Sequence, residues 1–252
     1  RDMIRTPEQI EGIRIAGKLN TGCLDAVADM IKPGISTQDI DDVVMQYCKD
    51  HDCHPSCLNY EGFPKAVCTS INEVVCHGIP KKEDILQPGD IVNVDMTLDY
   101  NGYYGDASRM FIIGGTTTPE KEQLVRVTKE CLDLGAEAAK PWGFLGDIGH
   151  AIQKHAEKYG YGVVRALCGH GVGLAMHEDP EVLHYGHRGT GMLLVPGMTF
   201  TIEPMINMGT WKVFIDADDP YGWEVISGDE QPSAQWEHTF LMTEHGVEIL
   251  SE

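Results

Sequence analysis

The spacing of hydrophobic residues predicts a helix near the start of the chain. Apolar residues recur at helical spacing in segment 10–19, opposite polar positions. Thr-Pro-Glu-Gln at 6–9 is typical of a helix start, because a threonine cap and a glutamine three residues later can satisfy free amide groups. We therefore expect a helix from Thr6 to about Ile31, where Pro33-Gly34 ends it.

The first half of the sequence recurs in the second half at a constant offset of 108 residues. Two motifs show this: Lys32-Pro33 with Asp39-Ile40 recurs as Lys140-Pro141 with Asp147-Ile148, and Pro88-Gly89 with Asp95 recurs as Pro196-Gly197 with Glu203. One offset kept through two motifs predicts a duplicated unit. We expect a single domain over 1–252, built from related halves at about 1–115 and 120–252, with Asp95 and Glu203 approaching a shared centre.

Further elements follow from the same patterns. Matching helices are predicted from Ser36 to about His51 and from Gly146 to about Tyr159. Strands are predicted at 66–70, 90–99, 103–113, 163–167, 198–206 and 236–242.

Asn101-Gly102 predicts a tight hairpin, because both turn positions need a positive φ. A two-residue loop pairs Asp95 with Ser108, which puts Asp106 on the same face as Asp95. The two carboxylates are then diagonal neighbours about 7–8 Å apart, and they repel each other unless a positive group lies between them.

Composition narrows the class of protein. The chain is 42% hydrophobic and has no apolar run that could cross a bilayer, and segment 1–5 lacks the apolar core of a signal peptide, so we expect a cytoplasmic protein. The formal charge of −20 argues against DNA or anionic membranes as partners, although a small patch such as Lys81-Lys82 could touch RNA. Eight cysteines without a Cys-x-x-Cys pair indicate reduced thiols.

Acidic residues inside apolar strands are the main chemical signal. Asp95 and Glu203 each interrupt a hydrophobic run, and Asp106 and Glu237 are placed to face the same centre. A buried carboxylate is costly unless it is paired with a base or bound to a metal. Because the chain has 19 basic residues against 39 acids, and Arg109 is the one nearby base in sequence, we favour metal over ion pairing.

Histidines complete the candidate site. His170 lies between glycines that allow close approach of the backbone, and it is the expected fifth ligand. The set of two Asp, two Glu and one His suits two divalent ions that share a water and lower its pKa. His77 and His177 frame this site and suit contact with a substrate amide or an oxyanion, although either could instead be a loop histidine bonded to backbone.

These residues resemble the type I methionine aminopeptidases from about Thr6 to Leu250. Seven segments match in order: Cys-His77-Gly-Ile-Pro, Val-Asn-Val-Asp95, Gly-Asp106, Gly-His170-Gly-Val-Gly, His177-Glu-Asp-Pro, Phe-Thr-Ile-Glu203-Pro and Gln-Trp-Glu237-His238-Thr. The resemblance implies an α+β fold, a pseudo-twofold antiparallel sheet backed by helices that is called pita-bread. It also implies that the metal ligands are Asp95, Asp106, His170, Glu203 and Glu237.

The resemblance further implies removal of the first methionine from nascent proteins whose second residue is small, by attack of a water or hydroxide that bridges the metals. Glu203 would be the general base, and His177 and His77 would hold the scissile peptide. The residues implied to bind substrate are His77, Cys57, Tyr60, Phe63, Cys68, Met176, His177 and Trp223. Phe63 and Met176 depart from the residues that the family usually has there.

The resemblance leaves several properties open. The divalent ions could be Fe, Mn, Co or Zn, and a monovalent cation, Na or K, is implied near Asn72, Val74 and Ser233. A monomer is expected, with possible transient contact to the ribosome. The nearest rivals are proline-specific peptidases of the same fold, for which we expect an additional domain before Thr6, and a silent relative, which would lack the metal ligands.

Overall fold

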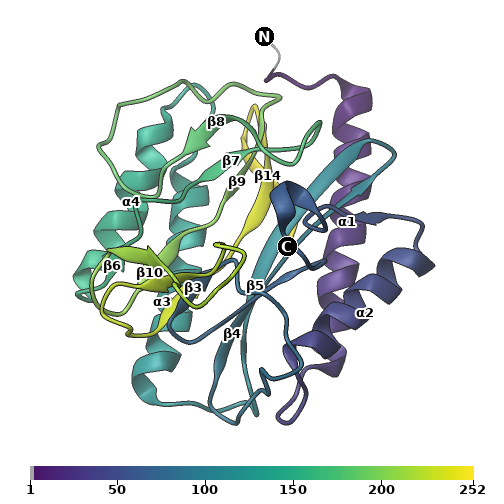
Figure 1. The fold of residues 1–252 in the computed structure, drawn as a ribbon. Coiled ribbons are helices and arrows are strands. Elements are labelled where there is room, and N and C mark those ends of the chain that lie inside the picture. The colour runs from purple at the N-terminus through teal and green to yellow at the C-terminus, as the bar shows by residue number, and fades with distance from the viewer. Residues whose placement is uncertain (1–2) are drawn as a thin grey trace.

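The computed structural model describes residues 3–252. Arg1 and Asp2, which belong to the segment expected to lack a signal-peptide core, lie outside the described residues. Each half contributes a pair of helices, and the strands lie between the two pairs (Figure 1). The helices are α1 (Pro7–Met30), α2 (Thr37–Asp50), α3 (Pro119–Ala138) and α4 (Leu145–Lys158), and Tyr60–Gly62 forms one 3-10 turn, η1. Within the described residues no helix is long and apolar enough to cross a membrane.

The strands form four small antiparallel sheets. The first half supplies β1 (His54–Pro55), β2 (Cys68–Ile71), β4 (Ile91–Tyr100) and β5 (Tyr103–Ile112) to one sheet. The second half supplies β7 (Gly169–Gly171), β8 (Glu178–Val182), β9 (Thr199–Ile202), β14 (His238–Thr243) and β15 (Gly246–Ser251) to another. The two smaller sheets contain β3 (Val74–Cys76), β11 (Val213–Ile215) and β12 (Val225–Ser227), and β6 (Gly162–Val163), β10 (Met205–Asn207) and β13 (Ser233–Gln235). The expected α+β fold is confirmed.

The helix starts behave as their sequences predict. Thr6 caps α1 and Ser36 caps α2, each in a reciprocal capping box with the residue three positions later. Helix α1 ends at Met30 and α2 at Asp50, one residue before the expected ends. Helix α3 was not predicted, although Thr118-Pro119-Glu120 repeats the start signal of α1.

The duplication is visible in the backbone. Helices α2 and α4 each have 14 residues, and both of their ends are related by the offset of 108. The residue before each helix forms an isolated β-bridge, Ser36 with Ile85 and Phe144 with Leu193, again at this offset. The halves therefore repeat a helix together with the loop that packs on it.

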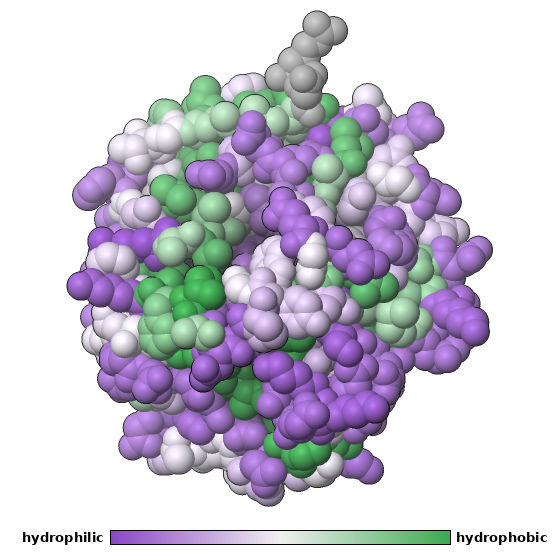
Figure 2. All heavy atoms as spheres, in the orientation of Figure 1, coloured by the Kyte–Doolittle hydropathy of each residue, from purple (hydrophilic) through white to green (hydrophobic). Residues whose placement is uncertain are grey.

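Each helix pair has its own hydrophobic core. The first is built around Leu24 and Met96, and the second around Phe200 and Phe240, all of which are fully or almost fully buried. Burial of this apolar surface stabilises the two faces of the fold. Figure 2 shows a largely hydrophilic surface on which hydrophobic residues form several separate patches.

Candidate metal centre and substrate pocket

The β4–β5 hairpin places the first two carboxylates as its sequence predicts. Tyr100 pairs with Tyr103 across the Asn101-Gly102 turn, and Asp95 pairs with Ser108. Ser108 in turn exchanges two main-chain hydrogen bonds of 3.1 Å with Glu237 from the other half. This bridge joins the halves, and it brings Glu237 level with Asp95.

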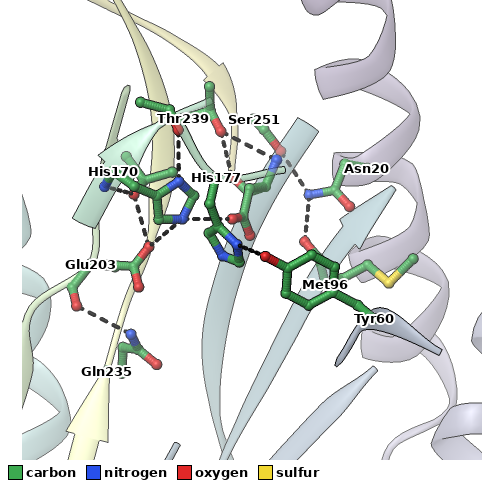
Figure 3. Close-up of polar contacts among 12 residues, drawn as sticks. Asn20, Tyr60, Met96, His170, His177, Glu203, Gln235, Thr239 and Ser251 are labelled. Carbon is green, nitrogen blue, oxygen red and sulfur yellow. Dashed lines mark hydrogen bonds and ion pairs between the residues drawn. The ribbon is translucent and has the colours of Figure 1, made fainter. Parts of the chain in front are cut away.

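The segment around His170 is narrow because glycines flank it. A Cβ at Gly169 would lie 2.5 Å from the carbonyl oxygen of Thr201, so no larger residue fits. The imidazole Nδ1 of His170 contacts the carbonyl oxygen of Gly171 at 2.9 Å, which leaves Nε2 facing the acids. Nε2 lies 3.4 Å from Asp106 Oδ2 and 3.5 Å from Glu203 Oε2 (Figure 3).

Glu203 lies in a break between strands. The predicted strand 198–206 is wrong in this respect, because β9 stops at Ile202 and β10 begins only at Met205, with Glu203-Pro204 between them. Proline cannot donate to a sheet hydrogen bond, which accounts for the interruption. The predicted strand 163–167 is also shorter, since β6 covers only Gly162–Val163.

Side chains replace the missing strand partners of Glu203. Its main-chain N–H donates to Nε2 of His184 at 3.0 Å, and its carbonyl accepts from Nε2 of Gln235 at 3.1 Å. The Thr201 hydroxyl donates to Glu203 Oε2 at 2.8 Å and accepts the His170 N–H at 3.1 Å. Glu203 is thus held in place by hydrogen bonds to both its main chain and its carboxylate.

Four of the five predicted ligands form a tight group. One ligand atom from each of Asp106, His170, Glu203 and Glu237 lies within 4.8 Å of the others, and Asp95 lines the same cavity. Asp106 Oδ1 and both Glu237 carboxylate oxygens are buried without a hydrogen-bond partner. Such a set of buried oxygens and one imidazole nitrogen fits divalent cations.

The alternative of neutralisation by Arg109 does not fit the structure. Its guanidinium lies on the other face of the hairpin, where it pairs with Asp25 at 2.8 Å and donates to the carbonyl oxygen of Glu252 at 2.6 Å. The acids therefore face one another across the centre, and within residues 3–252 His170 is the basic residue at ion-pair distance from them.

The pKa shifts of the residues in this centre all favour added positive charge. Burial, followed by the neighbouring carboxylates, raises the pKa of Asp95 and of Glu237, and burial also raises the pKa of Glu203. Burial alone would lower the pKa of His170, but the hydrogen bond to Asp106 and the charges of Glu203 and Asp106 outweigh it and raise the pKa to about 9. Each shift reduces negative charge, so the cluster is suited to an added cation.

The predicted substrate residues meet at this centre. A cavity of about 80 Å³ is lined by all five predicted ligands and by every predicted substrate residue: Cys57, Tyr60, Phe63, Cys68, His77, Met176, His177 and Trp223. It adjoins a larger hollow of about 700 Å³ that shares Tyr60, His77, His177 and Trp223. A small sulfur-containing and aromatic cavity suits an unbranched apolar side chain, and the hollow beyond it has room for more of a peptide.

The two framing histidines have defined surroundings. His177 Nδ1 lies 3.0 Å from the Tyr60 hydroxyl, and its ring centroid is 4.4 Å from that of His170 (Figure 3). His77 has a positive φ of 58° and packs edge-on against Trp223, with ring centroids 5.4 Å apart. Burial, aided by His177, lowers the pKa of His77 to about 4, so His77 is neutral near pH 7.

Sequence reasoning did not identify four polar residues of the site. Thr97 lies opposite Asp106 in the hairpin and lines the cavity, while Thr201, Gln235 and His184 support Glu203. Thr97, Thr201 and Gln235 each lie two positions from a predicted ligand, a spacing that puts two side chains on the same side of an extended chain. This spacing of two residues is the sequence signal by which Thr97, Thr201 and Gln235 could have been found.

The residues predicted for a monovalent cation lie away from this cavity. Ser233 donates its main-chain N–H to the carbonyl oxygen of Asn72 at 2.9 Å, and Val74 follows in β3. The Lys121 ammonium lies 3.2 Å from Asn72 Oδ1. The cation role of these residues stays a prediction.

Fold and site together define a metal-dependent hydrolase. The chain belongs to metallopeptidase family M24, whose model matches residues 11–244. It is 52% identical over 243 residues to methionine aminopeptidase A of Synechocystis, which covers 96% of this chain and 94% of the relative. It is 47% identical over 249 residues to the methionine aminopeptidase of Escherichia coli, which covers 98% of this chain and 93% of the relative.

Solved structures agree with this family. The methionine aminopeptidase of Rickettsia prowazekii superposes with a TM-score of 0.95 at 44% identity, covering 99% of both chains. The prolidase of Pyrococcus furiosus has a TM-score of 0.76 at 24% identity, and the match covers 65% of that chain. The first structure confirms the predicted resemblance, and the second shows a shared fold alone.

Proposed function

We propose that this protein is a methionine aminopeptidase that removes the first methionine from polypeptides whose second residue is small. The observation that supports this most is the position of the grouped carboxylates and His170 beside a small cavity of aromatic and sulfur-containing side chains. Relatives at about half identity over nearly the full chain carry the same name. Divalent metal use follows from the family and from the ligand set.

Two divalent ions, of Fe, Mn, Co or Zn, would be held by Asp95, Asp106, His170, Glu203 and Glu237. When bound, they would supply Lewis acidity and lower the pKa of a shared water. Glu203 would accept the proton of this water, since the Thr201 hydroxyl orients its carboxylate. His170 would bind through Nε2, because Nδ1 is engaged by the carbonyl oxygen of Gly171.

The remaining residues would hold the peptide. Cys57, Cys68 and Phe63, all buried, would enclose the methionine side chain together with Tyr60, Met176 and Trp223. His177, oriented by Tyr60, would contact the scissile peptide. His77, which is neutral near pH 7, would donate a hydrogen bond to the oxygen on which negative charge develops.

Several wider properties belong to the same proposal. Residues 1–252 would form one catalytic domain of two halves, which the repeated α2 and α4 support. Asn72, Val74 and Ser233 would hold Na or K. By family resemblance the protein would be a cytoplasmic monomer that acts on nascent chains, with transient contact to the ribosome and with no DNA or membrane partner.

Peptide hydrolysis tests the activity directly. Metal-stripped protein is assayed on Met-Ala-Ser and on Ala-Pro peptides, with and without added Mn²⁺ or Co²⁺. We expect metal-dependent release of methionine from Met-Ala-Ser, and its loss in Glu203→Gln, whose thermal unfolding checks that the variant is folded. Cleavage of Ala-Pro in place of Met-Ala-Ser would assign the chain to the proline peptidases, and no cleavage with any metal would overturn the proposal.

A further inference from the structure

Helix α4 borders a second cavity on the outer side of the fold, away from the metal centre. This cavity has a volume of about 400 Å³ and lies between α3, α4 and the loop that contains Arg188. Its lining is basic in a chain whose formal charge is −20: Lys140, Lys154, Lys158 and Arg188. His150 also lines it, as does His155, whose Nε2 lies 3.0 Å from Glu130 Oε1. The sequence shows no basic stripe because three separate segments supply these residues.

The four cations are available to a ligand. Within residues 3–252, none of Lys140, Lys154, Lys158 and Arg188 forms an ion pair or a side-chain hydrogen bond to another residue. Asp147 is the one acid in the lining, and its two carboxylate oxygens already accept main-chain N–H groups, from Gly189 at 2.7 Å and from Phe144 at 3.1 Å. The cavity thus combines excess positive charge with an acid that has a structural role.

The first half shows that the fold does not require the charge on α4, although Lys140 does have a basic counterpart in Lys32. Helices α2 and α4 are equivalent at the offset of 108, so each lining residue of α4 has a counterpart on α2. His150 corresponds to Asp42, Lys154 to Gln46 and Lys158 to Asp50. Helix α2 has Lys49 and Asp50 in its last turn where α4 has Glu157 and Lys158, so each helix has one lysine there to match the helix dipole. The dipole therefore does not explain Lys154, which lies a full turn earlier.

The walls of the cavity are fixed in place. The loop that contains Arg188 is tied to α4 by the Gly189–Asp147 bond, by a Gly146 N–H to Thr190 carbonyl bond of 2.8 Å, and by a Gly186 N–H to Gln153 Oε1 bond of 3.1 Å. Binding would therefore require little ordering of the backbone, which favours affinity.

The shape and charge of the cavity point to one chemical class of ligand. Lys154 and Lys158 are one helical turn apart, about 6 Å, so both can reach one chain of linked phosphates. Leu134, Ala138 and Ala151 supply an apolar part of the wall that can contact a base or a sugar. We propose that this cavity binds a small phosphate-rich molecule of the size of a nucleoside polyphosphate.

The test exchanges residues between the equivalent helices. The variant K154Q/K158D gives α4 the residues that α2 has at these positions. The matched control K18Q/K49D makes the same change of charge at two exposed lysines of α1 and α2, with Lys49 also in a last helical turn. Binding of ATP and of inorganic tripolyphosphate is measured by titration calorimetry on metal-loaded protein, at low and at high salt. Any metal chelation by these probes affects all variants equally.

We expect saturable binding of ATP to the wild type, weakened at least tenfold in K154Q/K158D, which corresponds to about 1.4 kcal/mol, and changed less than twofold in the control. High salt should weaken it. Methionine release should be equal in all three proteins, so this result is independent of the proposed activity. Equal affinities in the two variants, or no binding of ATP or tripolyphosphate to the wild type, would overturn the proposal.

Discussion

The hydrogen bond from the Glu203 main-chain N–H to the His184 imidazole gives the sharpest test of how the centre is built. His184 is fully buried, and burial lowers the pKa of this histidine to about 3, so it is neutral near pH 7. Its Nε2 must then be an acceptor, since it receives the Glu203 N–H at 3.0 Å. In the first half the equivalent Asp95 lies inside a continuous strand and needs no such support.

Replacing His184 by leucine leaves the Glu203 amide buried without an acceptor. A buried N–H without a partner costs about 1–3 kcal/mol, and loss of a residue that orients a metal ligand typically weakens metal binding about 10–100-fold. We expect His184→Leu to lose stability in this range and to bind Mn²⁺ at least tenfold more weakly. His184→Gln should recover most of both losses, because its amide oxygen can accept the same bond.

Two measurements separate positioning from general destabilisation. Chemical unfolding of the metal-free proteins gives the change in the free energy of unfolding, and competition with a metal indicator gives the affinity for Mn²⁺. A leucine variant that binds Mn²⁺ as the wild type does would refute the reasoning, as would a glutamine variant no better than leucine.

Three further predictions concern the pocket and its walls. Trp223→Ala removes edge contacts to Phe63 and His77, each worth about 0.5–1.5 kcal/mol. We expect kcat/KM for Met-Ala-Ser to fall about tenfold or more and the affinity for Mn²⁺ to stay unchanged. A loss of metal affinity would contradict this. Burial lowers the pKa of His77 from 6.5 to about 4, so between these pH values the unfolded chain takes up a proton that the folded chain does not. Stability should therefore fall as the pH decreases from 6.5 toward 4. Thermal unfolding at several pH values should show a smaller fall in His77→Gln. Gly78→Ala would place a Cβ 1.9 Å from the carbonyl oxygen of Thr69. The free energy of unfolding should fall by about 1–3 kcal/mol, and kcat/KM for Met-Ala-Ser should also fall because the neighbouring His77 is displaced. Wild-type values in both experiments would contradict this prediction.

Sequence reasoning succeeded where side chains follow a strict period. The two-residue turn at Asn101-Gly102 fixes the hairpin register, so the shared face of Asp95 and Asp106 could be predicted. The helix starts at Thr6 and Ser36 could be predicted as well, because capping is a local interaction.

Contacts between distant segments were harder to predict. Pro204 is a local signal for the break after β9, but the side chains that support Glu203 there, His184 and Gln235, lie 19 residues before and 32 residues after it. No local pattern identifies His184 as a partner of Glu203. Short strands such as β7 and β12 were missed for the same reason, since only their partners stabilise them. The basic cavity beside α4 likewise exists only once three segments have packed together.

The bridge between Ser108 and Glu237 joins two halves that each supply part of the centre. Asp95 and Asp106 come from one half, and His170, Glu203 and Glu237 from the other, so neither half has a complete set of ligands. A polypeptide with only one of the halves would need a second chain to complete the centre. Outside the centre the two halves need not keep the same residues, and the equivalent helix positions Asp50 and Lys158 carry opposite charges.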